Sequence, residues 1–186
     1  PVGVRGLQFR DEAVTVNELV PRLKALGVEA IVVLIHEGGT QTGTLQDING
    51  CEGGLAGSAI ADIIGRFDDE VDLVVSGHTH AAYNCRVANS VGRPISVTSA
   101  SAIGRVLTDI DVTIDPASRD ITAVTAANRL VDRTDTGVTP DAAIKGIVDS
   151  YSALVTPIAN QVIGAITESL PSTAIDIACN VPAGDL

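Results

Sequence analysis

The segment 58-SAIADIIGRFDDEVDLVVSGHTH-80 indicates a helix, a turn and a strand that ends at two histidines. The apolar run from Val71 to Val75 has the length and composition of a strand buried in a sheet. An upstream stretch, 15-TVNELVPRLKALGVEAIVVLIHEGG-39, has the same order. In it, Gly27 is a helix stop, and Ala30 to Ile35 is a strand that we expect to be buried on both faces. Two helix–strand units in tandem predict a parallel or mixed sheet covered by helices.

The rest of the chain indicates hairpins, then a boundary and one long helix. We expect the first helix to begin at a capping box formed by Thr15 and Glu18. Alternating β-branched segments broken by Gly, Asn and Pro predict further strands. These strands are expected at Asn84–Ala88, Pro94–Ser99, Val106–Ile114 and Ile121–Leu130. After the polar boundary 132-DRTDTGVTP-140 we expect a helix from Asp141 to about Gln161 and a short strand, Val162–Ile166.

Composition limits the classes of function that the chain can have. The 186 residues are 45% hydrophobic, which allows one ordinary domain with a core of Val, Ile, Leu and Ala. The net charge of −11 repels phosphate backbones, so we expect no nucleic-acid partner. The alternative explanation of this charge is that it serves only to keep the chain soluble. A bound metal cation could supply the positive centre that phosphorylated small molecules require.

No apolar run approaches the ~20 residues that span a bilayer. The chain has no Met and no signal pattern at its start, and we expect it to be a segment of a longer protein.

All three histidines follow predicted strands. His36 comes directly after the run that ends at Ile35, and His78 and His80 follow the run that ends at Val75. Because ligands collect at the carboxyl ends of strands in sheets with helical crossovers, we expect these side chains at one edge of the sheet. Neutral imidazole is the commonest metal ligand, so all three are candidate ligands of Zn, Mn or a similar ion. His36 taken alone could equally be a hydrogen-bonded turn histidine.

Glycines shape the predicted site. Gly77 permits a tight turn in which the two histidines that follow it can fan out toward two different ions. In the loop 36-HEGGTQTGT-44, Gly38 and Gly39 allow a ligand to approach the backbone closely. Glu37 is the nearest carboxylate, and we expect it to shape this loop rather than to bind metal. Glu37 and the two glycines are therefore our candidates for a substrate loop.

These motifs resemble one known family. The GHTH at 77–80, after an apolar strand, is similar to the last metal motif of calcineurin-like metallophosphoesterases, and 27-GVEAIVVLIHEGG-39 resembles the histidine motif that precedes it. The stretch 84-NCRVANSVGRPISVTSASAIGRVLTDIDVTID-115 resembles the strands that close the catalytic domain of the 5′-nucleotidase family. The resemblance runs roughly from Gly3 to Ile166. It implies an α/β fold, a partial four-layer α-β-β-α metallophosphoesterase sandwich with mixed sheets and a C-terminal linker helix.

The resemblance implies a reaction that uses two divalent metal ions, Zn, Mn or similar. The ions would clamp the phosphate and activate a bridging hydroxide for in-line attack. By motif match, His36 and His78 would bind one ion and His80 the other. The family's upstream Asp-x-His, Gly-Asp and Gly-Asn-His-Asp/Glu motifs, which supply the bridging aspartate and the catalytic histidine, do not occur here. We therefore expect no catalytic residue within this chain and no hydrolysis by the chain alone, although the parent protein would be an enzyme.

The resemblance also divides the chain and names its partners. It implies that residues 1–132 are the C-terminal half of the catalytic domain and that residues 133–186 are the linker helix and the start of the C-terminal domain. The partners would be the N-terminal half, the C-terminal domain and a nucleotide or other small phosphate ester. The activity implied is that of a 5′-nucleotidase. A 2′,3′-cyclic-nucleotide phosphodiesterase or a UDP-sugar hydrolase is the alternative within the enzymes. A non-catalytic module without a functional metal site is the alternative of another class.

Three cysteines remain to be placed. Cys51 follows the His36 loop and Cys85 lies just beyond His80, so a disulfide between them is geometrically reasonable. It would stabilise the fold by roughly 3–4 kcal/mol and imply an oxidising, secreted or cell-surface location. Two free buried thiols, or a cysteine at the metal site, are the alternatives. Cys179 would be left unpaired.

Overall fold

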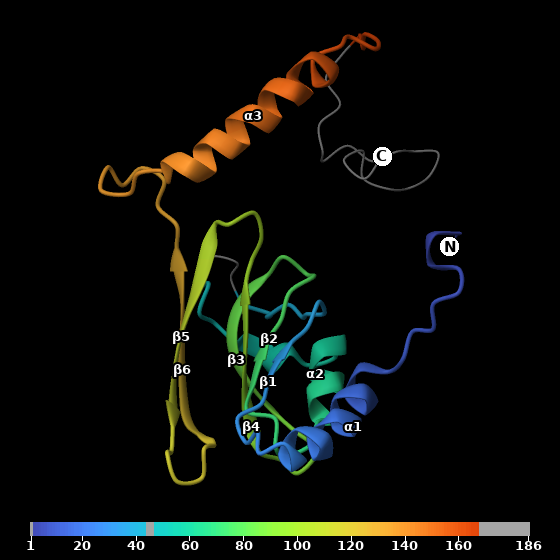
Figure 1. Cartoon of the computed structure of the whole chain (residues 1–186), viewed down its shortest axis with the longest axis vertical. Helices are drawn as coiled ribbons and strands as arrows, with labels where there is room; N and C mark the ends of the chain where they lie inside the picture. The colour runs from blue at the N-terminus through green and yellow to red at the C-terminus, as the bar shows by residue number, and fades with distance from the viewer. Residues whose placement is uncertain (1, 44–46, 168–186) are drawn as a thin grey trace. The chain divides into compact units, whose positions relative to one another are not determined.

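The computed structural model describes residues 2–43 and 47–167. The chain divides into two compact units between Thr134 and Asp135. Within the described residues, the first unit carries α1 (Glu12–Ala25), α2 (Ala59–Gly65), the 3-10 turns Val2–Val4 and Glu52–Leu55, and six strands (Figure 1). The second unit carries α3 (Ala142–Ala159).

Four strands form one mixed sheet in the order β1-β2-β4-β3. Their bounds are Val32–Leu34 (β1), Leu73–Val75 (β2), Ala82–Ala88 (β3) and Pro94–Ala100 (β4). Strands β1, β2 and β4 are parallel, and β3 pairs antiparallel with β4. The chain passes from β1 to β2 through α2, because parallel neighbours need a long crossover connection.

The remaining strands, β5 (Val106–Ile114) and β6 (Ile121–Leu130), form a separate antiparallel hairpin. The hairpin packs against β3 and β4 on one face of the mixed sheet, while α1 and α2 cover the other face (Figure 1). The first unit therefore has three layers, α-β-β. The predicted α/β fold with mixed sheets is confirmed, and the described residues show three of the four layers that the family resemblance implied.

The core lies between the helices and the mixed sheet. Ile60, Ile64 and Phe67 are fully buried in one cluster with Val74 of β2 and Val97 of β4. The buried positions along α2 recur at the spacing of one helical face, so this helix presents an apolar stripe to the sheet. Each such side chain stabilises the fold by about 1.5–3 kcal/mol when it is fully buried. The core is built mainly from branched aliphatic residues, as the aromatic-poor composition predicted.

Helix α1 begins earlier than the sequence predicted. Its N-cap is Asp11, whose carboxylate accepts the Val14 N–H at 2.9 Å and binds the Arg66 guanidinium at 2.8 Å. The hydrogen bond from Val14 and the neighbouring Arg66 hold the pKa of Asp11 below its usual value. The predicted capping box of Thr15 and Glu18 is wrong, because Asp11 caps the helix one turn upstream.

Strand β1 lies at the edge of the sheet, which corrects the expectation that the run 30–35 is buried on both faces. It pairs with β2 alone among the described strands. Val33 and Ile35 pack against the core, whereas Val32 is 46% and Leu34 is 77% exposed. Alternate residues of a strand face opposite sides, and the β5–β6 hairpin covers only β3 and β4 on the side of Val32 and Leu34.

In the second unit, α3 confirms the long helix that the sequence predicted. Asp141 is its N-cap and accepts the Ile144 N–H at 2.9 Å. The short strand predicted at Val162–Ile166 is wrong, since residues 161–167 form no strand. An extended segment needs a neighbour to pair its backbone groups, and no described strand pairs with this one. No helix within residues 2–43 and 47–167 is long and apolar enough to cross a membrane.

One buried asparagine joins the two sheets of the first unit. The amide nitrogen of Asn128, on β6, lies 2.7, 3.1 and 3.0 Å from the carbonyl oxygens of Ile48, Tyr83 and Ser99. Its amide oxygen accepts a hydrogen bond from the Thr108 hydroxyl at 2.6 Å. The side chain therefore links the hairpin to β3, to β4 and to the loop at residue 48.

We expect Asn128→Ala to lower the free energy of unfolding by about 3 kcal/mol, because several buried carbonyl groups lose their donor. Thr125→Ala, at an exposed position of the same strand, should change it by less than about 0.5 kcal/mol. Urea unfolding followed by circular dichroism measures both values. Equal losses for the two variants would contradict the role assigned to Asn128.

Candidate metal centre

Two of the three histidines meet at the carboxyl ends of β1 and β2. These strands are parallel neighbours, with Leu34 opposite Val75 in the register. The rings of His36 and His78 lie with their centroids 5.3 Å apart, in an edge-to-face arrangement with an interplanar angle of 69°. Both residues are exposed. The backbone therefore presents two imidazoles, side by side, to a ligand from solvent.

Hydrogen bonds join the loop after β1 to the turn after β2. The Gly77 N–H donates to the Glu37 carbonyl oxygen at 3.1 Å, and the Thr79 hydroxyl donates to the Gly39 carbonyl oxygen at 2.7 Å. The Glu37 carboxylate accepts the N–H of Gly38 at 2.8 Å. Glu37 thus shapes the loop with both its backbone and its side chain.

The two segments approach each other too closely for any side chain at Gly38. A Cβ atom there would lie 2.1 Å from the Gly77 carbonyl oxygen and 2.9 Å from the Thr79 hydroxyl oxygen. At Gly39 it would lie 2.8 Å from the Ser58 hydroxyl oxygen, at the N-cap of α2. Both glycines are buried, and the atoms that approach them closely are the protein's own: backbone at Gly38 and the Ser58 side chain at Gly39.

The sharp bend of the GHTH turn lies in the histidines themselves. His78 has φ of 67° and His80 has φ of 56°, both in the left-handed region that non-glycine residues rarely adopt. Gly77 does not have a positive φ, which corrects the expectation that its freedom forms the bend. Strained residues of this kind cost of order 1–3 kcal/mol each and cluster at functional sites.

Tyr83 lies on β3, just after the GHTH turn, and its role in the site was not predicted from the sequence. Its hydroxyl hydrogen-bonds to the Ser76 hydroxyl, which in turn donates to the Thr98 carbonyl oxygen at 2.8 Å. Burial raises the pKa of Tyr83, and hydrogen bonds with Ser76 and with the Gly39 backbone oppose this shift. Tyr83 thus contacts both segments that carry the histidines. An aromatic residue so close to GHTH, in a chain with only two tyrosines, was the available signal.

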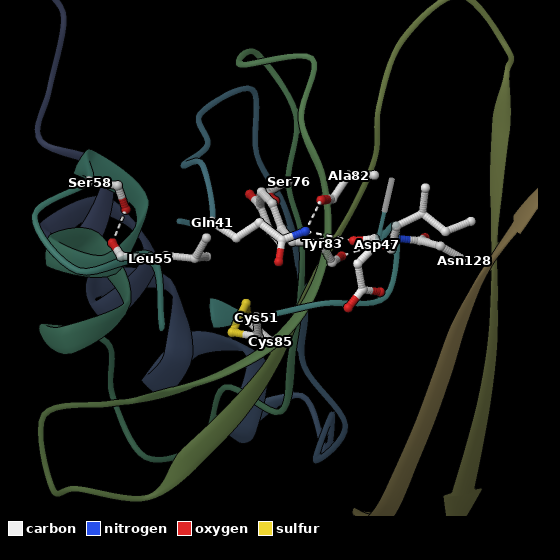
Figure 2. Close-up of a disulfide and its surroundings, with 11 residues drawn as sticks. Gln41, Asp47, Cys51, Leu55, Ser58, Ser76, Ala82, Tyr83, Cys85 and Asn128 are labelled. Atoms are coloured by element: carbon white, nitrogen blue, oxygen red, sulfur yellow. Dashed lines mark hydrogen bonds between the residues drawn. A yellow bond between two sulfur atoms is a disulfide. The ribbon is translucent and has the colours of Figure 1, made fainter. Parts of the chain in front are cut away.

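A disulfide joins Cys51 to Cys85, as the sequence suggested, and Figure 2 shows it beside β3. Its Cα atoms are 5.1 Å apart, and the sequence separation of the two cysteines is 34. Closing a loop of this length stabilises the fold by roughly 4 kcal/mol in the chain-entropy model. The alternatives of two free thiols or a cysteine metal ligand therefore do not hold for this pair. Cys179 lies outside the described residues.

Gln41 is a buried hydrogen-bond donor between His36 and the disulfide. Its amide nitrogen donates to the carbonyl oxygen of Asp47 at 2.6 Å and contacts that of Ala82 at 3.3 Å (Figure 2). The side chain is only 5% exposed, so these bonds form away from solvent. Gln41 thus links Asp47 to the start of β3, next to the GHTH turn.

The described residues do not form a complete metal site on their own. Within residues 2–43 and 47–167, no group of three or more His, Cys, Asp or Glu side chains is close enough to hold an ion. His36 and His78 are the two candidate ligands that the structure brings together, with ring centroids 5.3 Å apart. His80 instead lines a separate hollow together with Ser101 and Arg105. Further ligands would have to come from outside these residues.

No family model matches the chain. It is 29% identical over 164 residues to Endonuclease YhcR of Bacillus subtilis (strain 168), a match that covers 88% of this chain and 12% of that protein. It is 28% identical over 176 residues to Cell wall protein Lmo0130 of Listeria monocytogenes serovar 1/2a (strain ATCC BAA-679 / EGD-e), covering 91% of this chain and 21% of that protein. The chain therefore spans about an eighth and about a fifth of these relatives.

Solved structures of similar fold include the 5′-nucleotidase precursor from Thermus thermophilus, with a TM-score of 0.60 and 23% identity over 84% of this chain and 29% of that one. The calcineurin-like phosphoesterase YfkN from Bacillus subtilis has a TM-score of 0.55 and 19% identity, over 82% of this chain and 46% of that one. The chain has the fold of the 5′-nucleotidases and calcineurin-like phosphoesterases. The family resemblance seen in the sequence is thus confirmed in the fold.

We expect Gly38→Ala to lower the free energy of unfolding by about 3 kcal/mol or more, because the methyl group meets a backbone oxygen that cannot move without breaking the turn. The measurement is thermal or urea unfolding of the disulfide-bonded chain.

Gly65→Ala is the matched control for this substitution. A Cβ atom at Gly65, the last residue of α2, would meet nothing nearer than 4.0 Å, so Ala should be neutral or stabilising there. A Gly38→Ala variant as stable as the Gly65→Ala variant would show that the close contact between the two segments does not exist.

Proposed function

We propose that this chain is the histidine-bearing part of a secreted, metal-dependent phosphoesterase of the 5′-nucleotidase type. The observation that carries the proposal is the pairing of His36 and His78 at the ends of neighbouring parallel strands, with ring centroids 5.3 Å apart. The fold of solved nucleotidases and phosphoesterases supports the same class. The substrate would be a nucleotide or another small phosphate ester.

The histidines have distinct roles in this proposal. His36 and His78 bind one divalent ion, Zn, Mn or similar, and His80 binds the second. When bound, such ions polarise the phosphoryl group and lower the pKa of a bound water. The joined loops hold the imidazoles in place, and Tyr83 positions Ser76 just before the turn. Since the chain holds no catalytic residue of its own in this proposal, the isolated chain would not hydrolyse AMP.

The parts of the site that this chain lacks would come from the same protein. We assign residues 1–132 to the C-terminal half of the catalytic domain and residues 133–186 to a linker helix and the start of a C-terminal domain. The exposed edge of β1, with the apolar side chains of Val32 and Leu34, is suited to pair with a strand from the N-terminal half. The chain matches 46% of the YfkN structure, which supports a larger catalytic domain.

A phosphodiesterase is the second candidate, and one observation favours it. The relative with 29% identity is named an endonuclease, and an endonuclease cleaves phosphodiester bonds. The net charge of −11 argues against a long nucleic acid, so the diester would be small, such as a 2′,3′-cyclic nucleotide. A UDP-sugar hydrolase would use the same metal ligands and differ in contacts that lie outside this chain.

Two observations support a secreted or cell-surface location. The Cys51–Cys85 disulfide is of the kind that persists in oxidising compartments. The second relative is named a cell wall protein.

Metal titration tests the proposal. Isothermal titration calorimetry with Zn²⁺ should detect weak binding by the disulfide-bonded chain, because the chain supplies only part of the ligand set. His36→Ala and His78→Ala should each weaken this binding by about tenfold or more. Asp111→Asn, at an exposed acidic position of β5, is the control for adventitious surface binding and should leave the affinity unchanged.

Unfolding curves of the same variants separate a lost ligand from a lost fold. We expect the histidine variants to unfold close to wild type. If they bind Zn²⁺ as wild type does, the metal proposal fails and the chain is a non-catalytic module.

A further inference from the structure

A hollow of about 290 Å³ lies beside His80 and is lined by neither His36 nor His78. Its polar wall is formed by His80, Ser101 and Arg105, and its apolar wall includes Val106 and Leu130. Val106 is buried at the start of β5, whereas Leu130, at the end of β6, is 70% exposed. The hollow thus combines one cationic group with an apolar surface.

Arg105 is free to bind an anion in this hollow. Its Nε donates to the Ala102 carbonyl oxygen at 3.3 Å. Among the described residues, its two terminal nitrogens have no hydrogen-bond or ion-pair partner. In a chain with a net charge of −11, Arg105 gives this hollow a local positive charge. Guanidinium groups bind phosphate oxygens through two parallel hydrogen bonds.

The backbone holds Arg105 in place relative to His80. The Ser101 hydroxyl donates to the His80 carbonyl oxygen at 3.0 Å, and the Arg105 carbonyl oxygen accepts the Val131 N–H at 2.9 Å. Between these anchors, Ser101 and Ile103 have φ of 60° and 63°. Such left-handed conformations in non-glycine residues persist only where the surroundings fix them, and they favour a functional role for this loop.

We infer that this hollow binds an organic phosphate, with the phosphate oxygens on Arg105 and the organic group against Val106 and Leu130. The inference rests on the proposed phosphoesterase function and extends it, because it assigns a substrate contact that lies beside His80 and involves no metal. It also narrows the ligand, since an apolar wall favours a phosphate that carries an apolar or flat organic group over inorganic phosphate.

The test is a titration of the metal-free chain with inorganic phosphate and with phenyl phosphate, followed by ¹H–¹⁵N NMR. We expect saturable shifts of the His80, Ser101 and Gly104 amide signals, and tighter binding of phenyl phosphate. Arg105→Gln should weaken the binding of both probes by about tenfold, as for loss of a charge-assisted pair. Arg105→Lys keeps the charge but loses the bidentate geometry, so it should weaken binding by less.

Two controls separate this site from general effects. Arg22→Gln removes the same charge at a distant position, in the last turn of α1. It should leave the affinities for inorganic phosphate and for phenyl phosphate unchanged. Leu130→Ala should abolish the preference for phenyl phosphate, whereas Leu107→Ala, at another exposed leucine of the same hairpin, should retain it.

The inference is overturned if no saturable shift occurs at these amides, if Arg22→Gln weakens binding as much as Arg105→Gln, or if the two probes bind equally. Because the titration contains no metal, its failure leaves the histidine metal site intact. Failure of zinc binding likewise leaves the Arg105 site intact.

Discussion

The site depends on how closely the backbone at Gly38 approaches the carbonyl oxygen of Gly77. That space does not accept a methyl group, so the loop after β1 and the turn after β2 pack directly against each other. Hydrogen bonds from Gly77 to Glu37 and from Thr79 to Gly39 then hold the two segments together. His36 and His78 belong to these two segments, so their separation of 5.3 Å follows from the backbone as well as from side-chain conformation.

The surrounding structure stabilises a turn that is strained by itself. The left-handed conformations of His78 and His80 cost of order 1–3 kcal/mol each. The buried Tyr83 hydroxyl, the Asn128 amide and the Cys51–Cys85 disulfide all act on the segments that border the turn. Side chains held in this way lose little conformational entropy if they bind a ligand, which is the general advantage of a preorganised site.

The sequence predicted the elements that local patterns determine. Apolar runs followed by histidines located β1, β2 and the metal-binding candidates, and alternating β-branched segments located the hairpin strands β5 and β6 with their observed bounds. What it could not predict depends on contacts between distant segments. The exposure of Leu34 follows from the position of β1 at the sheet edge, and the cap at Asp11 is reinforced by Arg66, which lies at the end of α2. The roles of Tyr83 and Asn128 likewise require knowing which strands lie against each other.

In the proposed site, two parallel strand ends bring His36 and His78 to one ion, and diffraction measures this directly. Crystals of the chain soaked with Zn²⁺ and measured at the zinc absorption edge locate the ion by its anomalous signal. We expect a peak ~2.0–2.1 Å from one ring nitrogen of His36 and one of His78. Zinc found only at surface carboxylates, with the two rings turned away from each other, would contradict it.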